Sequence, residues 1–167
     1  IRALPEFNLY EDFWKIYTNS DHQPPQYIAA DAKVEEALVT DGCEVYGEVY
    51  RSILGPNVVV EKGAVVKDSI IMENTVIGEN CIIDKAIIAD EVTVGDDVTM
   101  GIGADVPNKF KPNIYSFGLV TIGEKSVIPS RVQIGKNTAI SGVTVGADYV
   151  NGVLESGETL IKAGDQA

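Results

Sequence analysis

Residues 58–91 contain two copies of one 17-residue unit laid end to end. The first copy reads VVVEKG, AVVKDS and IIMEN, and the second reads TVIGEN, CIIDKA and IIADE. Each copy therefore divides into six, six and five residues. Three short strands per turn are typical of a hexapeptide-repeat β-helix. The repeat therefore predicts an all-β fold, a parallel β-helix whose interior holds the recurring apolar residues Val60, Val66, Ile71, Ile77, Ile83, Ile88 and Val94.

Parallel connections are normally right-handed, but hexapeptide repeats are the known exception, so we expect a left-handed β-helix. The pattern divides the chain into three parts. Residues 1–26 form a linker with a short aromatic helix, because Leu9, Phe13 and Ile16 follow helical spacing. Residues 27–145 form the β-helix, with an inserted loop at 101–119 that is rich in Gly, Pro and Asn. Residues 146–167 form a tail that caps the open end.

Two details of this division stay open. The short helix packs either against its own β-helix or against a domain outside this chain, because so short a helix is not stable alone. The spacing from Leu38 to Ile53 is 15 residues instead of 17, so one corner of an early coil is two residues short. The chain also begins at Ile1 and not at Met, so we expect a fragment or a processed product.

Composition and charge exclude several partners. The formal net charge is −12, which disfavours nucleic acid and anionic membranes because both attract Lys and Arg. The sequence shows neither a signal peptide nor an apolar stretch of about 18 residues. Cys43 and Cys81 both lie in the repeats, about two coils apart and too distant for a disulfide. We expect buried, reduced thiols and a cytoplasmic protein.

The sequence offers no catalytic centre, cofactor site or metal site. Many hexapeptide β-helices are acyltransferases that use a histidine between coils as a general base. The one histidine here, His22, precedes the first coil and is expected to be solvated. Gly101-Ile102-Gly103 lacks the strand–loop–helix context of a nucleotide-binding loop, so we interpret it as an ordinary loop.

Three basic residues, Arg51, Lys67 and Lys85, occupy nearly the same place in successive coils. A stack of cations along one edge suits an anion such as a sugar phosphate. Asp68 and Asp84 interleave with them, however, and this favours a salt-bridged ladder on the outer surface.

Part of the sequence resembles a known family. Residues 11–18 (EDFWKIYT), 23–28 (QPPQYI), 38–43 (LVTDGC) and 63–72 (GAVVKDSIIM) are similar to the linker and β-helix of bacterial ADP-glucose pyrophosphorylases, the glucose-1-phosphate adenylyltransferases of glycogen synthesis. The likeness covers most of 8–98 and weakens after Gly101. It implies an N-terminal nucleotidyltransferase domain, missing from this chain, that binds ATP and Mg²⁺ and makes ADP-glucose.

The resemblance implies further properties. In that family the β-helix supports tetramer assembly and forms part of allosteric sites for sugar phosphates such as fructose 1,6-bisphosphate and for the inhibitor AMP. Some members use arginines of the C-terminal tail there, whereas residues 146–167 hold only Lys162. We therefore expect a regulatory and oligomerisation domain that is inactive alone. The alternatives are a hexapeptide acyltransferase, the tail of another sugar nucleotidyltransferase, or a non-catalytic regulatory subunit.

Overall fold

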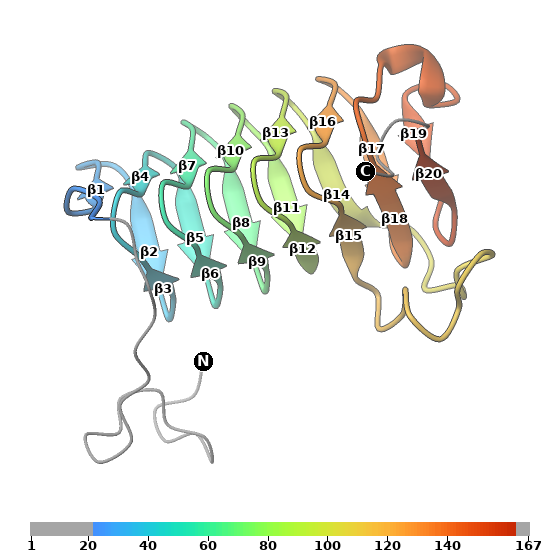
Figure 1. Cartoon of the computed structure of the whole chain (residues 1–167), viewed down its shortest axis with the longest axis horizontal. Coiled ribbons are helices and arrows are strands. Elements are labelled where there is room, and N and C mark those ends of the chain that lie inside the picture. The colour runs from blue at the N-terminus through green and yellow to red at the C-terminus, as the bar shows by residue number, and fades with distance from the viewer. Residues whose placement is uncertain (1–21, 163–167) are drawn as a thin grey trace.

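The structure is a computed structural model that describes residues 22–162. The aromatic helix expected in the linker lies outside the described residues. Within 22–162 the chain forms three parallel sheets, of six, seven and seven strands. Figure 1 shows successive coils stacked along one axis, and each complete coil contributes one strand to each sheet. No helix among these residues is long and apolar enough to cross a membrane.

Strands of the first sheet are β1 (Tyr27–Ile28), β4 (Glu44–Val45), β7 (Val59–Val60), β10 (Val76–Ile77), β13 (Thr93–Val94) and β16 (Val127–Ile128). The second sheet contains β2 (Lys33–Glu35), β5 (Glu48–Tyr50), β8 (Val65–Lys67), β11 (Ile82–Asp84), β14 (Thr99–Ile102), β17 (Gln133–Gly135) and β19 (Val153–Leu154). The third contains β3 (Leu38–Val39), β6 (Ile53–Leu54), β9 (Ile70–Ile71), β12 (Ala86–Ile88), β15 (Val120–Ile122), β18 (Thr138–Ser141) and β20 (Thr159–Ile161). A 3-10 helix, η1 (Gly146–Asp148), precedes β19.

Every strand is short because the chain must turn at a corner after two to four residues. Many corners hold a residue in the left-handed region, where Asn, Asp and Gly are favoured. Asn57 and Asn74 have φ of 57° and 54°, and the Asn57 side-chain amide donates to the Asn74 side-chain oxygen across one coil at 3.1 Å. The turn residues of the sequence therefore set both the corners and part of the stacking between coils.

The core is a column of aliphatic side chains inside the three sheets. Ile77, Ile83 and Ile88 come from the three sides of one coil, and each side chain is fully buried. The other predicted interior residues are also buried, so the predicted register is confirmed. The predicted all-β parallel β-helix of hexapeptide repeats is confirmed too, and the arrangement is consistent with the left-handed form. Both cysteines are buried free thiols.

The chain leaves the stack once. Ala86 of β12 pairs with Val120 of β15, which is 34 positions later, whereas Ile87 of the same strand pairs with Ile70, which is 17 positions earlier. The excursion covers 103–119, because Gly101 and Ile102 belong to β14 and Ile102 pairs with Gly135 after a bulge. The interpretation of Gly101-Ile102-Gly103 as a loop is therefore wrong for its first two residues.

Residues beyond 145 also extend the β-helix. Strands β19 and β20 pair in parallel with β17 and β18, so the second and third sheets continue to Ile161. The sequence predicts that the β-helix ends at 145, because the regular hexapeptide pattern ends there. Figure 1 shows this last incomplete coil beside β18.

Candidate functional site

The short coil creates a hollow at one corner of the β-helix. Between the first and second sheets, the first coil turns through residues 29–32 and the third through 61–64. The second coil turns through Tyr46 and Gly47 alone. Because this corner lacks two residues while its neighbours protrude, it leaves a recess of about 510 Å³. We call this recess the corner hollow.

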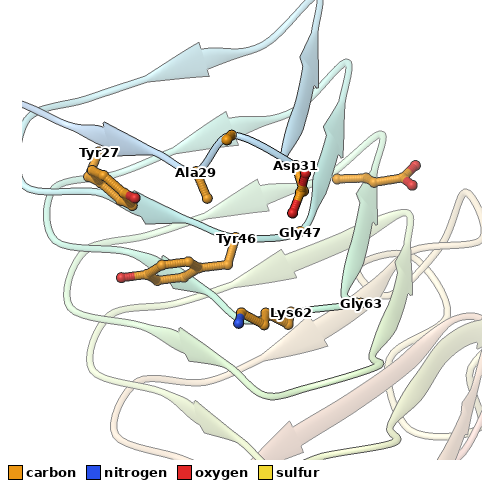
Figure 2. Close-up of a pocket in the computed structure, with 9 residues that line it drawn as sticks. Tyr27, Ala29, Asp31, Tyr46, Gly47, Lys62 and Gly63 are labelled. Carbon is orange, nitrogen blue, oxygen red and sulfur yellow. The ribbon is translucent and has the colours of Figure 1, made fainter.

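Aromatic and charged side chains line the corner hollow from different sides. Figure 2 shows the rings of Tyr27 and Tyr46 on one side, Asp31 on the other, and Lys62 on the corner of the next coil. The two tyrosine rings lie 5.7 Å apart between centroids and are tilted by 51°. Such a mixture of aromatic surface and a few polar groups is a usual feature of small-ligand sites.

The floor of the hollow is backbone. Gly47 is buried, and a Cβ placed there would lie 2.3 Å from the Ala64 carbonyl oxygen of the next coil. The amide of Glu48 donates to that same oxygen at 2.8 Å. Any side chain at position 47 would therefore push against hydrogen-bonded backbone and not into open space.

Hydrogen bonds orient the tyrosines around this corner. The Tyr46 hydroxyl donates to the Glu44 carboxylate at 2.7 Å, and this bond raises the pKa of Tyr46 above its ordinary value. The Tyr50 hydroxyl donates to Glu48 in the same way, and the pKa of Tyr50 is likewise raised. Both phenols are therefore neutral hydrogen-bond donors, but only Tyr46 lines the corner hollow, since Tyr50 lies at the other end of β5.

The predicted cation cluster is not a single column. Arg51 occupies the same corner position as Asp68 and Lys85, with Asp68 between the two cations. Arg51 donates two hydrogen bonds to the Asp68 carboxylate, at 2.8 and 2.9 Å. This pairing, followed by the charge of Lys85, holds the pKa of Asp68 below its usual range.

Lys67 lies one position earlier on the strand. It pairs with Tyr50 below and Asp84 above, and its Nζ is 5.6 Å from the centroid of the Tyr50 ring. The spacings of 16 and 18 residues between Arg51, Lys67 and Lys85 explain the offset, because one coil is 17. The geometry therefore favours the salt-bridged ladder over an anion site formed by all three cations.

The excursion at 103–119 is fastened by two buried asparagines. The Asn137 amide donates to Asp105 Oδ1 and to the Val106 carbonyl at 2.6 and 2.7 Å, and Asn137 Oδ1 accepts from the Gly118 amide at 2.8 Å. Asn108 donates to the Asn137 carbonyl at 2.8 Å. The fastened loop exposes apolar side chains to solvent, including Phe110, Ile114 and Phe117.

The described residues show no group suited to metal chemistry. Between His22 and Lys162, no three His, Cys, Asp or Glu side chains lie close enough together to hold an ion. His22 is exposed, as expected. Burial raises the pKa of the Cys81 thiol to about 11, which makes this cysteine a poor nucleophile near neutral pH.

Sequence patterns do not reveal the corner hollow or the loop anchors. The 15-residue spacing signals a short corner, but it does not say which of three corners is short. Asn137 ends a hexapeptide at a regular corner, but Asn108 lies in the excursion 29 positions earlier and belongs to no repeat, so no sequence pattern links the two.

Fold and corner geometry define a hexapeptide-repeat β-helix protein whose departures from the regular repeat lie at one short corner and in one excursion. Residues 24–122 match the family described as GlmU-like, C-terminal hexapeptide. The chain belongs to this family.

Three relatives indicate the closer relationship. The glucose-1-phosphate adenylyltransferase of Lachnospira eligens is 65% identical over 99% of this chain, which spans 39% of that protein. The Acetivibrio thermocellus protein of the same name is 43% identical over 99% of the chain, again 39% of the relative. The Thermotoga maritima protein of that name is 49% identical over 96% of the chain and 38% of the relative. The chain thus spans about two fifths of the curated relatives it matches.

Proposed function

We propose that this chain is the regulatory and assembly domain of a glucose-1-phosphate adenylyltransferase that makes ADP-glucose for glycogen synthesis. The observation that carries the proposal is the 65% identity to a glucose-1-phosphate adenylyltransferase over 99% of the chain. The complete protein would join ATP and glucose 1-phosphate, with Mg²⁺ assisting attack on the α-phosphorus and pyrophosphate leaving. That chemistry belongs to the part of the relatives that this chain does not span.

No catalytic step is assigned to the described residues. They lack a clustered set of metal ligands, and their one histidine, His22, is exposed before the first coil. These residues therefore support the β-helix as scaffold and not as catalyst. They also give no support to an acyltransferase, which needs a general base between coils.

An activity assay on two chains tests the proposal. The complete gene product is expected to release pyrophosphate from ATP only when glucose 1-phosphate and Mg²⁺ are present. The 167-residue chain is expected to release neither pyrophosphate nor CoA from acyl-CoA above a blank. A complete protein that is inactive with ATP but active with another nucleotide would assign the chain to a different sugar nucleotidyltransferase.

The assembly role is supported by the exposed apolar side chains of the excursion. Phe110, Ile114 and Phe117 are 59%, 65% and 85% exposed on a loop whose base is fixed by hydrogen bonds. Exposed apolar groups on an ordered loop usually mark a contact. We propose that the chain self-associates through this loop, as part of a homo-oligomer with the tetrameric state of the resembled family.

Light scattering tests the assembly proposal. Phe117→Ser is expected to lower the mean mass of the 167-residue chain at micromolar concentration. Ile82→Ser removes a half-exposed apolar side chain from the second sheet and is expected to leave the mass unchanged. A monomeric wild-type chain would overturn self-association without touching the proposed enzyme family.

The regulatory role would use the corner hollow or the interface with the catalytic part. Calorimetric titration of the complete protein with fructose 1,6-bisphosphate and AMP tests this role. Two single variants distinguish the sites: Lys62→Ala changes the corner hollow, and Arg51→Ala changes the ladder. Loss of effector binding in Arg51→Ala alone would restore the ladder as the anion site.

A further inference from the structure

The outer face of the third sheet carries a straight row of aliphatic side chains. Leu38, Ile53, Ile70 and Ile87 pair in register on strands β3, β6, β9 and β12. Their neighbours in the same strands, such as Leu54 and Ile71, point inward and are fully buried. We call the four outward residues the aliphatic column. Ile70 is 40% exposed and Met72 beside it 38%, while Leu38, Ile53 and Ile87 are half-buried, so solvent reaches the column most at its third strand in the described part of the chain.

The aliphatic column is not a general property of the repeat. On the second sheet, the outer positions of β2 and β5 hold Lys33, Glu35 and Glu48. Those of β8 and β11 combine Val65 and Ile82 with Lys67 and Asp84, so charged side chains interrupt any apolar row there. Parallel strands that are apolar on both faces are usually covered on both faces. The third sheet therefore requires a cover that the second sheet does not.

The dimensions of the aliphatic column indicate what kind of structural element could pack on it. Four strands at a spacing of about 4.8 Å give a strip about 14 Å long and one side chain wide. Such a strip covers well under the roughly 800 Å² that each partner of a stable complex usually buries. It matches a single short helix, because nine helical residues are about 13.5 Å long and a helix is about 10 Å across.

The same chain contains a segment of that length. Residues 9–17, which lie outside the described residues, carry Leu9, Phe13 and Ile16 at helical spacing, with Glu11 and Lys15 on the opposite side. Pro24 is fixed at the corner between β3 and β4, because its carbonyl accepts from the Gly42 amide at 2.7 Å. The six residues 18–23 that connect the segment to Pro24 reach up to about 20 Å when extended. That reach suffices, since this corner directly follows β3, the first strand of the column.

We propose that the segment 9–17 docks across the aliphatic column, with Leu9, Phe13 and Ile16 against Leu38, Ile53, Ile70 and Ile87. The docked segment covers the outer face of the third sheet and fixes the direction in which the chain approaches the β-helix. The aliphatic column is then buried within the chain and is not available for binding another protein. This assignment does not depend on the proposed enzyme activity.

Crosslinking within the 167-residue chain tests the docking. Phe13→Cys is combined in turn with Ile53→Cys and Ile70→Cys, and each variant is treated with a short bismaleimide. The native thiols of Cys43 and Cys81 are fully buried, so the introduced pair reacts first. A matched control combines Phe13→Cys with Ile82→Cys, which places an equally tethered cysteine on an exposed position of the second sheet.

The expected result is an internally linked chain of monomer mass in at least one third-sheet variant, with little such product in the Ile82→Cys control. An undocked, flexible segment would give product on both sheets, so a preference for the third sheet reports the docked position. Equal yields on the two sheets overturn the proposal. A product of dimer mass from the third-sheet variants also overturns it, and assigns the column to a second copy.

A second measurement does not require crosslinking. Trp14 is the one tryptophan, and helical spacing would put it at the edge of the apolar face that includes Phe13. Ile70→Glu is expected to shift Trp14 emission to longer wavelength, whereas Ile82→Glu leaves it unchanged, with folding of both variants checked by thermal unfolding. Unchanged emission in a folded Ile70→Glu variant overturns the docking.

Discussion

Asn108 donates its side-chain amide to the backbone carbonyl of Asn137 at 2.8 Å, across 29 positions of sequence. Its side-chain oxygen accepts from the amides of Phe110 and Lys111 at 2.9 and 2.8 Å. Asn108 is only 2% exposed, so its polar atoms are satisfied by protein and not by solvent. This one side chain connects the excursion to the corner of the next coil.

Replacing Asn108 should therefore release the loop. Asn108→Ala leaves the amides of Phe110 and Lys111 without their acceptor, and the free energy of unfolding should fall by about 1–3 kcal/mol. Trypsin should also cleave sooner after Lys109, because the loop opens locally. Asn113→Ala, at an exposed position of the same loop, is the control and should change neither quantity. Equal effects of the two substitutions would refute the anchoring role.

Position 47 should accept only glycine. A Cβ at Gly47 would lie 2.3 Å from the Ala64 carbonyl oxygen, so Gly47→Ala should lower the free energy of unfolding by about 1–3 kcal/mol. A Cβ at Gly146 would meet no atom within 4 Å, and Gly146→Ala should be nearly neutral. Chemical denaturation of both variants measures the difference, and a neutral Gly47→Ala would show that the short corner can shift.

The interior register can be tested on two adjacent residues. Ile83 is fully buried and Ile82 is 50% exposed on the same strand. Ile83→Asp places an unpaired charge in the narrow core and should cost more than about 3 kcal/mol, enough to threaten folding. Ile82→Asp should cost much less. Thermal unfolding of both gives the comparison, and similar melting temperatures would contradict the assigned register.

The Arg51 pairing should appear in the titration of Asp68. Because the folded-state pKa of Asp68 is lowered, its contribution to stability is fully present above the unfolded value of about 3.9 and is lost as the pH falls through the folded-state pKa. In Arg51→Ala the Asp68 pKa should rise toward its ordinary value, as followed by carboxyl carbon shifts in NMR. Lys33→Ala, which removes the Glu35 pair instead, should leave Asp68 unchanged. A normal Asp68 pKa in the wild-type chain would disprove the pairing in solution.

Cys81 should be inert in the folded chain and should affect stability at alkaline pH. Its pKa is raised to about 11 by burial, so the unfolded chain loses this proton first as the pH rises above about 8.5. The Cys81 contribution to stability therefore falls between that pH and about 11. Cys81→Ala should show a smaller loss of stability over this range than the wild type. Rapid reaction of both thiols with Ellman's reagent at pH 8, without denaturant, would contradict their burial.

The sequence predicted the sheets more completely than the surface. A period of 17 places Ile70 beside Ile87 and orients every inward residue, because each coil repeats the backbone of the coil below. The positions of surface side chains depend on departures of one residue from the 17-residue period. Such a departure places Lys67 beside Tyr50 and not in the column of Arg51. The anchors Asn108 and Asn137 depend on contacts between an irregular loop and a distant corner, which no period encodes.

The direct pairing of Ala86 with Val120 has a practical consequence. The excursion leaves after Ile102 and returns at Val120, at a corner that two residues span elsewhere, as at 36–37. Lengthening a surface loop costs little, about 0.6 kcal/mol for each doubling. This corner is therefore a natural place to graft a reporter peptide or a small folded module, because the strands on either side, β14 and β15, are each held by a strand of the preceding coil, β11 and β12.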